Sequence, residues 1–268
     1  MNHVIPVSTN RSALFKIGVL YLVAAALAVG LKVHYSRADS RALEWILKPT
    51  AFLVECLSGT PFTPEAGTGY ISNDRHTVIA PGCAGVNFLI ASFCMAACRG
   101  LTSRRSVRAG VCWLGFSMAA ATALTLCVNA VRITLSMHLY EADIYGGWLT
   151  PDRVHRIAGC AIYFLSLSLF YPALQKIAPA GYRSELPEKA KRGVWMAGAG
   201  LSPFFWYCLI VLVIPFFNRI LRQTGHPAAE HCWTVLTVSA VVFLLVFLIR
   251  SAWRLMELKR VATESKQN

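Results

Sequence analysis

Long apolar runs alternate with short polar connections along this chain. A helix needs about 20 residues to cross the roughly 30 Å hydrocarbon layer of a bilayer. Six runs approach that length, at residues 14–31, 84–98, 109–137, 154–174, 194–217 and 232–249. The pattern predicts an all-α integral membrane protein, a polytopic bundle of about six transmembrane helices. With no internal repeat or linker evident, we expect a single domain over residues 1–268.

Two shorter segments between the first and second runs break this pattern. Residues 42–57 mix apolar positions with two glutamates, a lysine and a proline. They predict an amphipathic helix that lies at the interface or re-enters the membrane, with spanning left open. Residues 69–80 place a Ser-Asn-Asp turn signal between two short β-prone pieces. We expect a small hairpin there, at the outer face and leading into Cys83.

Composition agrees with the membrane class. Of 268 residues, 56% are hydrophobic and only 15% are charged, and the mean hydropathy is +0.51. The net charge of +13 needs no nucleic acid as partner, because basic residues gather in the cytoplasmic loops of membrane proteins. The nine cysteines offer no C-x-x-C pair and no disulfide framework.

Basic residues in the connections predict the orientation. The connections after the second and fourth runs and the C-terminal tail are rich in lysine and arginine, which places them in the cytoplasm. The acidic connection between the third and fourth runs then lies outside, and we expect a bacterial cytoplasmic (inner) membrane protein. The first outer loop departs from the rule, because it contains Lys32, Arg37, Arg41, Lys48 and Arg75.

The segment I-A-P-G-C-A-G-V-N-F-L-I places Cys83 just before the second run. Unsatisfied backbone N–H groups and the helix dipole favour a thiolate at that position, and the thiolate is the nucleophilic form. Gly82 and Gly85 leave room for a substrate backbone, although glycines there are also ordinary turn residues. Most cysteines in membrane helices are structural, as we interpret Cys94, Cys98, Cys112, Cys127, Cys160 and Cys208.

Two further reactive side chains fall at the predicted outer helix ends. Arg132 lies in the third run, with Asn129 and Ser136 at helical spacings that form one polar stripe. An intramembrane arginine is a functional candidate by default, and a snorkelling interfacial arginine is the alternative. His155 begins the fourth run, and Gly159 one turn later permits close helix packing. Cysteine, arginine and histidine at one membrane depth predict a common site.

These residues resemble the exosortase/archaeosortase family of membrane cysteine transpeptidases, most nearly the exosortase K branch. The resemblance rests on P-G-C-A-G-V-N-F around Cys83, N-A-V-R-I around Arg132 and H-R-I-A-G around His155. It covers about residues 77–170, the expected catalytic core. Family members commonly have serine where this chain has Ala84, and some have arginine in place of the histidine.

The resemblance implies a mechanism. Cys83 would attack a peptide carbonyl and form a thioester, His155 would act as general base or acid, and Arg132 would hold developing negative charge. It implies exported protein substrates with a C-terminal signal of a short motif (Pro-Glu-Pro in the commonest targets), a transmembrane helix and a basic tail. The accepting nucleophile stays open, and no cofactor or metal is implied. The supporting residues are Asn129, Gly82, Gly85, Asn87 and Gly159.

Other functions are compatible with the residues. A membrane thiol–disulfide oxidoreductase would use outer-face cysteines, of which Cys56, Cys83 and Cys232 are candidates. A non-catalytic channel or scaffold would use Arg132 to bind an anion. A metal site built from His226, His231 and Cys232 fits no standard spacing.

Overall fold

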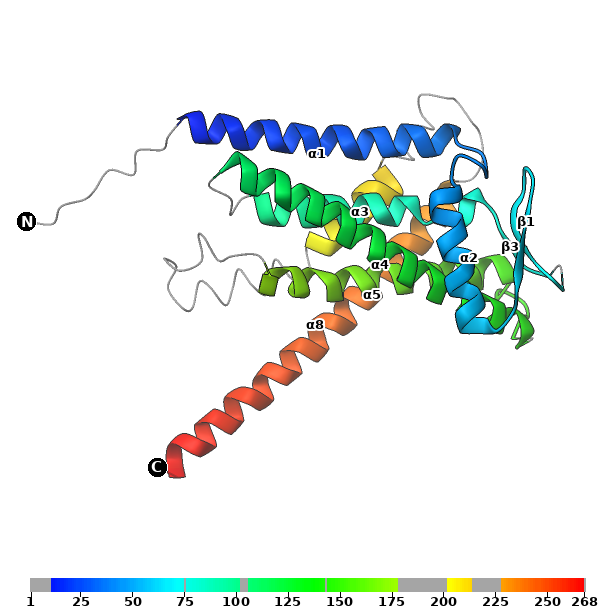
Figure 1. Ribbon diagram of the computed structural model, residues 1–268. Coiled ribbons are helices and arrows are strands. Elements are labelled where there is room, and N and C mark those ends of the chain that lie inside the picture. The colour runs from blue at the N-terminus through cyan, green and yellow to red at the C-terminus, as the bar shows by residue number, and fades with distance from the viewer. Residues whose placement is uncertain are drawn as a thin grey trace, which may run out of the picture. The chain divides into compact units, whose positions relative to one another are not determined.

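The protein is mostly helical, with four helices long and apolar enough to cross a membrane and one small antiparallel sheet (Figure 1). The structure, a computed structural model, describes residues 11–74, 76–101, 106–142, 144–177, 202–213 and 228–267. They fall into two compact units, which are described separately: Met1–Ala130 with Ala173–Glu188, and Val131–Pro172 with Lys189–Asn268.

In the first unit, helix α1 (Arg11–Arg37) packs against helix α3 (Val86–Leu101). The side of α1 that carries Leu20, Ala24 and Ala28 is buried, and these residues recur every four positions. Small side chains on such a face let two membrane helices approach closely. Helix α3 is the core of the unit, because 61% of its candidate span is buried against 11% of that of α1.

The end of α1 corrects one expectation. The sequence predicted a first span at residues 14–31 and assigned Lys32 and Arg37 to the outer loop, but the candidate span is Ile17–Arg37. The helix continues because the long basic side chains near its end can keep their charges at polar groups while their stems stay on the apolar surface. Two of the five basic residues assigned to the first outer loop, Lys32 and Arg37, therefore belong to a helix end.

The segment at residues 42–57 is confirmed as a helix, α2 (Glu44–Ser58), and it is not among the candidate spans of the described chain. It ends at Gly59, whose φ of 73° and N–H bond to the Glu55 carbonyl form a left-handed cap. The buried face of α2 packs against the sheet. Whether α2 rests at the membrane interface stays a prediction.

The expected hairpin is confirmed and extended by one strand. The sheet has the order β1 (Phe62–Glu65), β2 (Gly69–Ser72), β3 (Val78–Ile79), all antiparallel. Glycine is required at position 69, because its φ is +129° and a Cβ there would lie 2.3 Å from the Ile79 carbonyl oxygen. Strand β3 leads directly into the turn that carries Cys83.

Helix α4 (Val107–Glu141) is one continuous helix that contributes residues to both units. Helix α5 (Pro151–Ile177) follows it in the second unit, and both are candidate spans, as the sequence predicted. Within the last two predicted runs the described residues form shorter apolar helices, Ser202–Leu212 and, inside α8 (Ala228–Gln267), Trp233–Ile249. The π-helical turn η2 (Leu209–Val213) overlaps the end of the first of them. Residues 194–201 and 214–217 of the fifth run lie outside the described residues. Within the described residues, four helices are therefore long and apolar enough to cross a membrane, and the expectation of about six spans stays a prediction.

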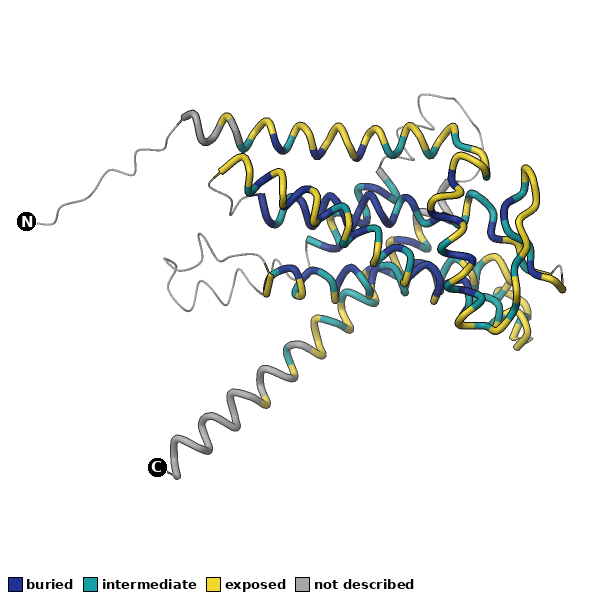
Figure 2. The backbone as a smooth tube through the Cα atoms, viewed as in Figure 1, coloured by how far each residue is buried: buried dark blue, intermediate teal, exposed yellow. Residues whose placement is uncertain are grey.

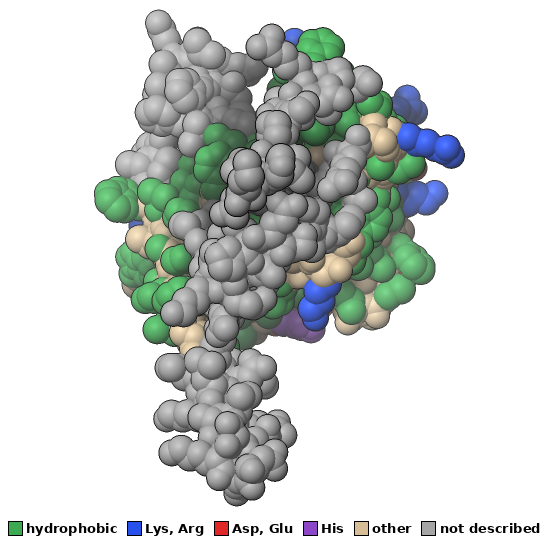
Figure 3. Space-filling view, turned by 90° about the vertical axis from the view of Figure 1, so that its left-hand side faces the viewer, with side chains coloured by type: hydrophobic (Ala, Val, Ile, Leu, Met, Phe, Trp, Pro, Cys, Tyr) green, Lys and Arg blue, Asp and Glu red, His purple; other side chains and the backbone are tan. Residues whose placement is uncertain are grey.

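Large apolar side chains remain exposed on these helices, as a lipid-facing surface requires. On α1, Phe15, Leu22 and Val29 are 74%, 70% and 62% exposed and recur every seven residues, opposite the buried stripe. Figure 2 shows α1 mostly exposed and α3 mostly buried. Hydrophobic side chains dominate the described surface in Figure 3.

Candidate active site

Cys83 ends the short 3₁₀ turn η1 (Pro81–Cys83), which connects β3 to α3. Its backbone N–H donates to the Ala80 carbonyl at 2.8 Å. Gly85 then turns the chain into α3 with a φ of +68°, a conformation that favours glycine. The thiol is free and half-exposed, just before the helix as the sequence predicted. The positive φ at position 85 therefore accounts for the glycine there.

Asn129 holds the peptide of Cys83. Its Nδ2 donates to the Cys83 carbonyl oxygen at 2.6 Å across 46 residues of sequence, and the asparagine is fully buried. Gly82 beside it is exposed, and a Cβ there would meet nothing within 4 Å. The buried Asn129 side chain thus fixes the Cys83 carbonyl, whereas the backbone at the neighbouring Gly82 is exposed.

In the second unit, Arg132 lies against helix α5. Only 9% of the residue is exposed, and its guanidinium carbon is 5.3 Å from the centre of the Tyr163 ring, a cation–π distance. Gly159 lies four residues before Tyr163 on α5, and an added Cβ at this glycine would sit 3.5 Å from Arg132 Cδ. Gly159 therefore provides the surface on which the arginine stem rests.

His155 is connected to Arg132 through Ser136. The Ser136 hydroxyl donates to the Arg132 carbonyl at 2.9 Å, and His155 Nδ1 lies 3.0 Å from the same hydroxyl oxygen. A serine hydroxyl has one hydrogen, so while that hydrogen is donated to the Arg132 carbonyl the oxygen accepts from His155 and Nδ1 carries the proton. The lone pair is then on Nε2, the form of the ring that can act as a base.

The start of α5 sets the position of His155. Thr150 precedes Pro151, and its carbonyl accepts from the Val154 N–H at 3.0 Å while its hydroxyl accepts from the Arg153 N–H at 3.4 Å. Threonine followed by proline is a favoured beginning of a helix, because proline needs no N–H partner there. His155 falls one turn into the helix.

Sequence reasoning missed Lys32 as a member of the Cys83 region. Its ammonium donates to Asn87 Oδ1 at 2.6 Å, joining the end of α1 to the first turn of α3. Asn87 had been named as a supporting residue without a partner. The signal in the sequence was that Lys32 directly follows the first apolar run, so that it could continue the same helix. The assignment of Lys32 to the outer loop left this possibility out.

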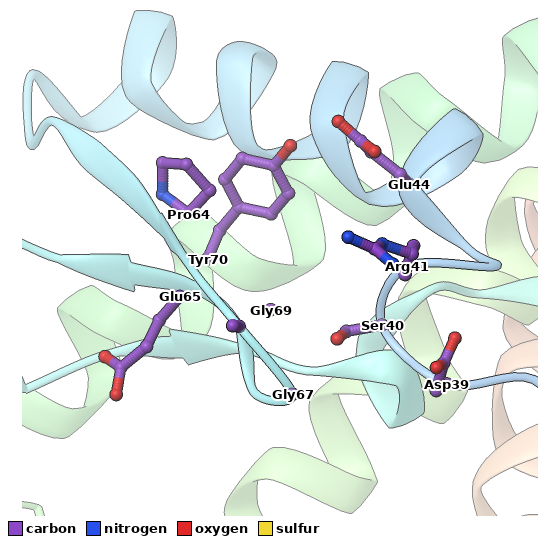
Figure 4. A pocket seen from close by; sticks show the side chains of 10 residues that line it. Asp39, Ser40, Arg41, Glu44, Pro64, Glu65, Gly67, Gly69 and Tyr70 are labelled. Atoms are coloured by element: carbon purple, nitrogen blue, oxygen red, sulfur yellow. The ribbon is translucent and has the colours of Figure 1, made fainter.

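A groove of about 530 Å³ lies elsewhere in the first unit, between the segment before α2 and the β1–β2 hairpin (Figure 4). Asp39, Glu44 and Glu65 line it together with Arg41. Burial raises the pKa of the Tyr70 phenol, which also lines the groove, and the Glu44 carboxylate adds to this shift. Cys83 is not among the lining residues.

The described cysteines and possible metal ligands do not gather into a disulfide or a group of three ligands. Its residues contain no group of three or more histidine, cysteine or acidic side chains that could hold a metal ion. All eight cysteines whose side chains are described are free. His226 and the side chains of His231 and Cys232, considered above as ligands, lie outside the described residues.

The predicted site residues thus form two groups. Cys83 is joined to Asn129, and Arg132 is joined to His155 through Ser136. Asn129 and Arg132 are three positions apart on the continuous helix α4. That all three predicted catalytic residues meet in one cavity stays a prediction. Comparisons with protein-family models, curated proteins and solved structures found no match to this chain.

Proposed function

We propose that this chain is a membrane-embedded cysteine peptidase and transpeptidase that cleaves the C-terminal sorting signals of exported proteins. The observation that carries the proposal is the role of helix α4. Asn129 on this helix anchors the peptide of Cys83, and Arg132 follows three residues later, about one helical turn. The backbone carbonyl of Arg132 accepts from the Ser136 hydroxyl, which also lies within hydrogen-bond distance of His155 Nδ1. A thiol, a cation and a base therefore each have a contact with helix α4 or a place on it.

In the first step, Nε2 of His155 takes the proton of the Cys83 thiol. The thiolate attacks the carbonyl carbon of the scissile peptide and forms a tetrahedral intermediate. The C–N bond then breaks, the same histidine returns the proton to the leaving amine, and a thioester remains on Cys83. The hydrogen bond from Nδ1 to Ser136 supports this assignment because it leaves Nε2 unprotonated.

Arg132 stabilises the negative charge that develops on the carbonyl oxygen. A guanidinium offers several N–H donors in a fixed plane, and it retains its charge when buried. Its stem rests on Gly159 and its plane lies near Tyr163, so few side-chain rotations are open to it. Donors that are already oriented need no reorganisation during the reaction.

In the second step, a nucleophile of an acceptor molecule attacks the thioester carbonyl. Its proton passes to His155, the C–S bond breaks, and Cys83 leaves as thiolate, which takes the proton back from His155. The acceptor takes the acyl group, and the enzyme is restored without a cofactor. Water in place of the acceptor gives hydrolysis.

We further propose that the enzyme is a multi-pass protein of the bacterial inner membrane with its site at the outer face. Support comes from four apolar helices and from the basic connections that alternate with an acidic one. A substrate with its own transmembrane helix would present the preceding motif at that depth. Reporter tags after residue 104 and at the C-terminus should report cytoplasm, and a tag at Gly146 the outer side. An outer signal after residue 104 would contradict this orientation.

The experiment that tests the function uses a co-expressed exported protein that ends in a Pro-Glu-Pro motif, an apolar helix and an arginine-rich tail. Full-length enzyme should shorten this protein, and the Cys83→Ala variant should not. Cys56→Ala is the matched control, because Cys56 is also free and is exposed on α2. Processing by the Cys83→Ala variant would reject the peptidase and leave a channel or scaffold.

A further inference from the structure

The connection between α4 and α5 is tied to the ends of both helices. The Tyr145 hydroxyl donates to the Leu139 carbonyl at the end of α4, at 2.9 Å. Arg153, in the first turn of α5, donates through Nη1 to the Trp148 carbonyl at 3.0 Å, and an antiparallel bridge closes the connection. All of these residues belong to the second unit. The side chains of the connection therefore have definite places relative to α4 and α5.

The exposed apolar side chains change in kind where α4 ends. Val131 and Leu135, on α4 within the second unit, are exposed aliphatic residues. At the connection two aromatic residues, Tyr140 and Trp148, join the exposed Ile144, and they are 63% and 65% exposed. Tyrosine and tryptophan combine an apolar ring with one polar group, which suits the boundary between a membrane and water.

The location of these two rings agrees with such a boundary. Helices α4 and α5 are both long and apolar enough to cross a membrane, so the residues that join them belong at one of its surfaces. Tyr140 lies 6.1 Å from the Tyr145 ring, and the Arg153 guanidinium carbon lies 5.3 Å from the centre of the Trp148 ring. The two exposed rings are thus supported by neighbours within the same connection, and exposed apolar groups of this kind mark interaction sites with proteins or membranes.

The Arg132–His155 region lies on the membrane side of Tyr140. Ser136, which is 3.0 Å from His155 Nδ1, precedes Tyr140 by four residues, or about 6 Å along a helix axis. Arg132 precedes Tyr140 by eight residues, or about 12 Å along the same axis. The level of Tyr140 in the membrane therefore sets the depth of the candidate base and cation.

We propose that the α4–α5 connection is a membrane-interface anchor, in which Tyr140 and Trp148 occupy the layer of lipid headgroups. His155 and Arg132 then lie below that layer, at the edge of the hydrocarbon. The partner is the phospholipid surface of the membrane that α4 and α5 cross. The anchor does not depend on the proposed peptidase activity, but it adds a place to it: the bond cut would lie at the membrane surface rather than in water.

The test measures how brominated lipids quench the fluorescence of Trp148 in the full-length protein in phospholipid nanodiscs. Because the chain has seven tryptophans, the signal of Trp148 is the difference between wild type and Trp148→Phe. Bromine quenches only nearby rings, so its position along the acyl chain reports depth. We expect most of this signal to be lost with bromine at the headgroup end of the acyl chains, and most of it to be retained with bromine at the chain end.

Two further variants provide the depth scale. Val131→Trp adds a ring at an exposed position beside Arg132, nine residues or about 14 Å before Tyr140 along the helix. The added signal should show the reverse order, with more quenching by bromine at the chain end. Leu135→Trp takes its place if that variant fails to fold. Trp113→Phe removes a buried tryptophan, and the signal lost with it should respond least to either lipid.

Three results would overturn the proposal. A Trp148 signal that acrylamide quenches in water and that neither lipid quenches would make the connection an aqueous surface, open to a peptide rather than to lipid. A Trp148 signal quenched most by bromine at the chain end would place the ring in the hydrocarbon. Equal depths for Trp148 and a tryptophan at position 131 would contradict the placement of Arg132 below the headgroups. No substrate is processed in this assay, so its failure is distinct from failure of the proposed function.

Discussion

The Cys83 region and the Arg132–His155 region are held in different ways. At Cys83 the contacts are made by the backbone: its N–H donates to Ala80, and its carbonyl accepts from Asn129. In the other region the side chains hold one another, because Arg132 lies near Tyr163 and His155 bonds to Ser136. The nucleophile is fixed through its main chain, and the base and cation through their functional groups.

This difference predicts how each region tolerates substitution. Changing the Cys83 side chain leaves these two backbone contacts in place, so chemistry should be lost without loss of folding. Changing Arg132 or His155 removes a group that also orients its neighbour, so chemistry and local order should change together. The predictions below test this contrast, from the largest effect to the smallest.

Cys83→Ala should abolish processing of the motif-bearing substrate while the protein still inserts and unfolds at an unchanged temperature. Cys83→Ser should be nearly as inactive, because a hydroxyl ionises far less readily than a thiol. The measurement is substrate shortening on immunoblots, with thermal unfolding of the purified variants in nanodiscs. An active serine variant would show that thiolate chemistry is not required.

His155→Ala should slow processing by about 10² to 10⁴-fold, the usual contribution of a general acid or base. Ser136→Ala should have a smaller effect of the same kind, because the imidazole loses the acceptor that keeps the proton on Nδ1. Initial rates from pH 5 to 9 measure both. His138→Ala, at an exposed position on the same helix as Ser136, is the control and should behave as wild type.

Arg132→Lys should lower the rate by about 10² to 10³-fold, as loss of an oriented oxyanion donor does. Lysine keeps the charge but not the planar set of donors. The same variant should reduce order around Tyr163, which hydrogen exchange of the adjoining α5 amides measures. Arg153→Lys in the first turn of α5 serves as control. A fully active Arg132→Lys protein would limit Arg132 to a structural or anion-attracting role.

Asn129→Ala should move the Cys83 turn without removing any reacting group. It leaves a carbonyl without its donor, which costs about 1–3 kcal/mol when the group is buried. We expect a lower unfolding temperature and slower processing. Thr125→Val, one turn earlier on α4, removes only a local bond to the Ala121 carbonyl and is the matched control. Equal stability of the two variants would count against Asn129 as the anchor of Cys83.

The smallest effect concerns the turn before β3. The Asp74 carboxylate accepts from the Ser72 hydroxyl and from the His76 N–H, and these bonds lower the pKa of Asp74. A lowered pKa means that the stabilisation is complete above the unfolded value of about 4 and is lost as pH falls through the folded value. Hydrogen exchange of the His76 amide should therefore lose protection only in acid. Asp74→Asn should lack this step, and Glu65→Gln should keep it.

The spans were predictable because hydrophobic periodicity is a local property. The run that follows Cys83 and the runs that contain Arg132 and His155 all form helices, and the turn at Asp74 is where the sequence predicts it. Strand β1 was missed because Pro64 argues against a strand. It is tolerated because β1 is an edge strand, where a residue without an N–H can point outward.

The contacts of the candidate site were not predictable, because they join residues far apart in the chain. The sequence placed Asn129 in a polar stripe, but nothing local indicates that its amide meets the Cys83 carbonyl. Lys32 was assigned to a loop because its charge ended the apolar run. Its partner on α3 explains why the helix continues through it. A hydropathy profile sums the values of single residues and therefore carries no information on contacts between residues that are distant in sequence.

The central claim is that Cys83 forms a covalent acyl-enzyme, and trapping that species tests it most directly. Full-length enzyme in nanodiscs is mixed with the motif-bearing substrate, quenched in acid within the first turnover and digested for mass spectrometry. We predict an acyl adduct on Cys83 that neutral hydroxylamine releases, as a thioester requires, and its accumulation in His155→Ala if release is slowed more than formation. Substrate processed at full rate with no adduct on Cys83 would contradict the account.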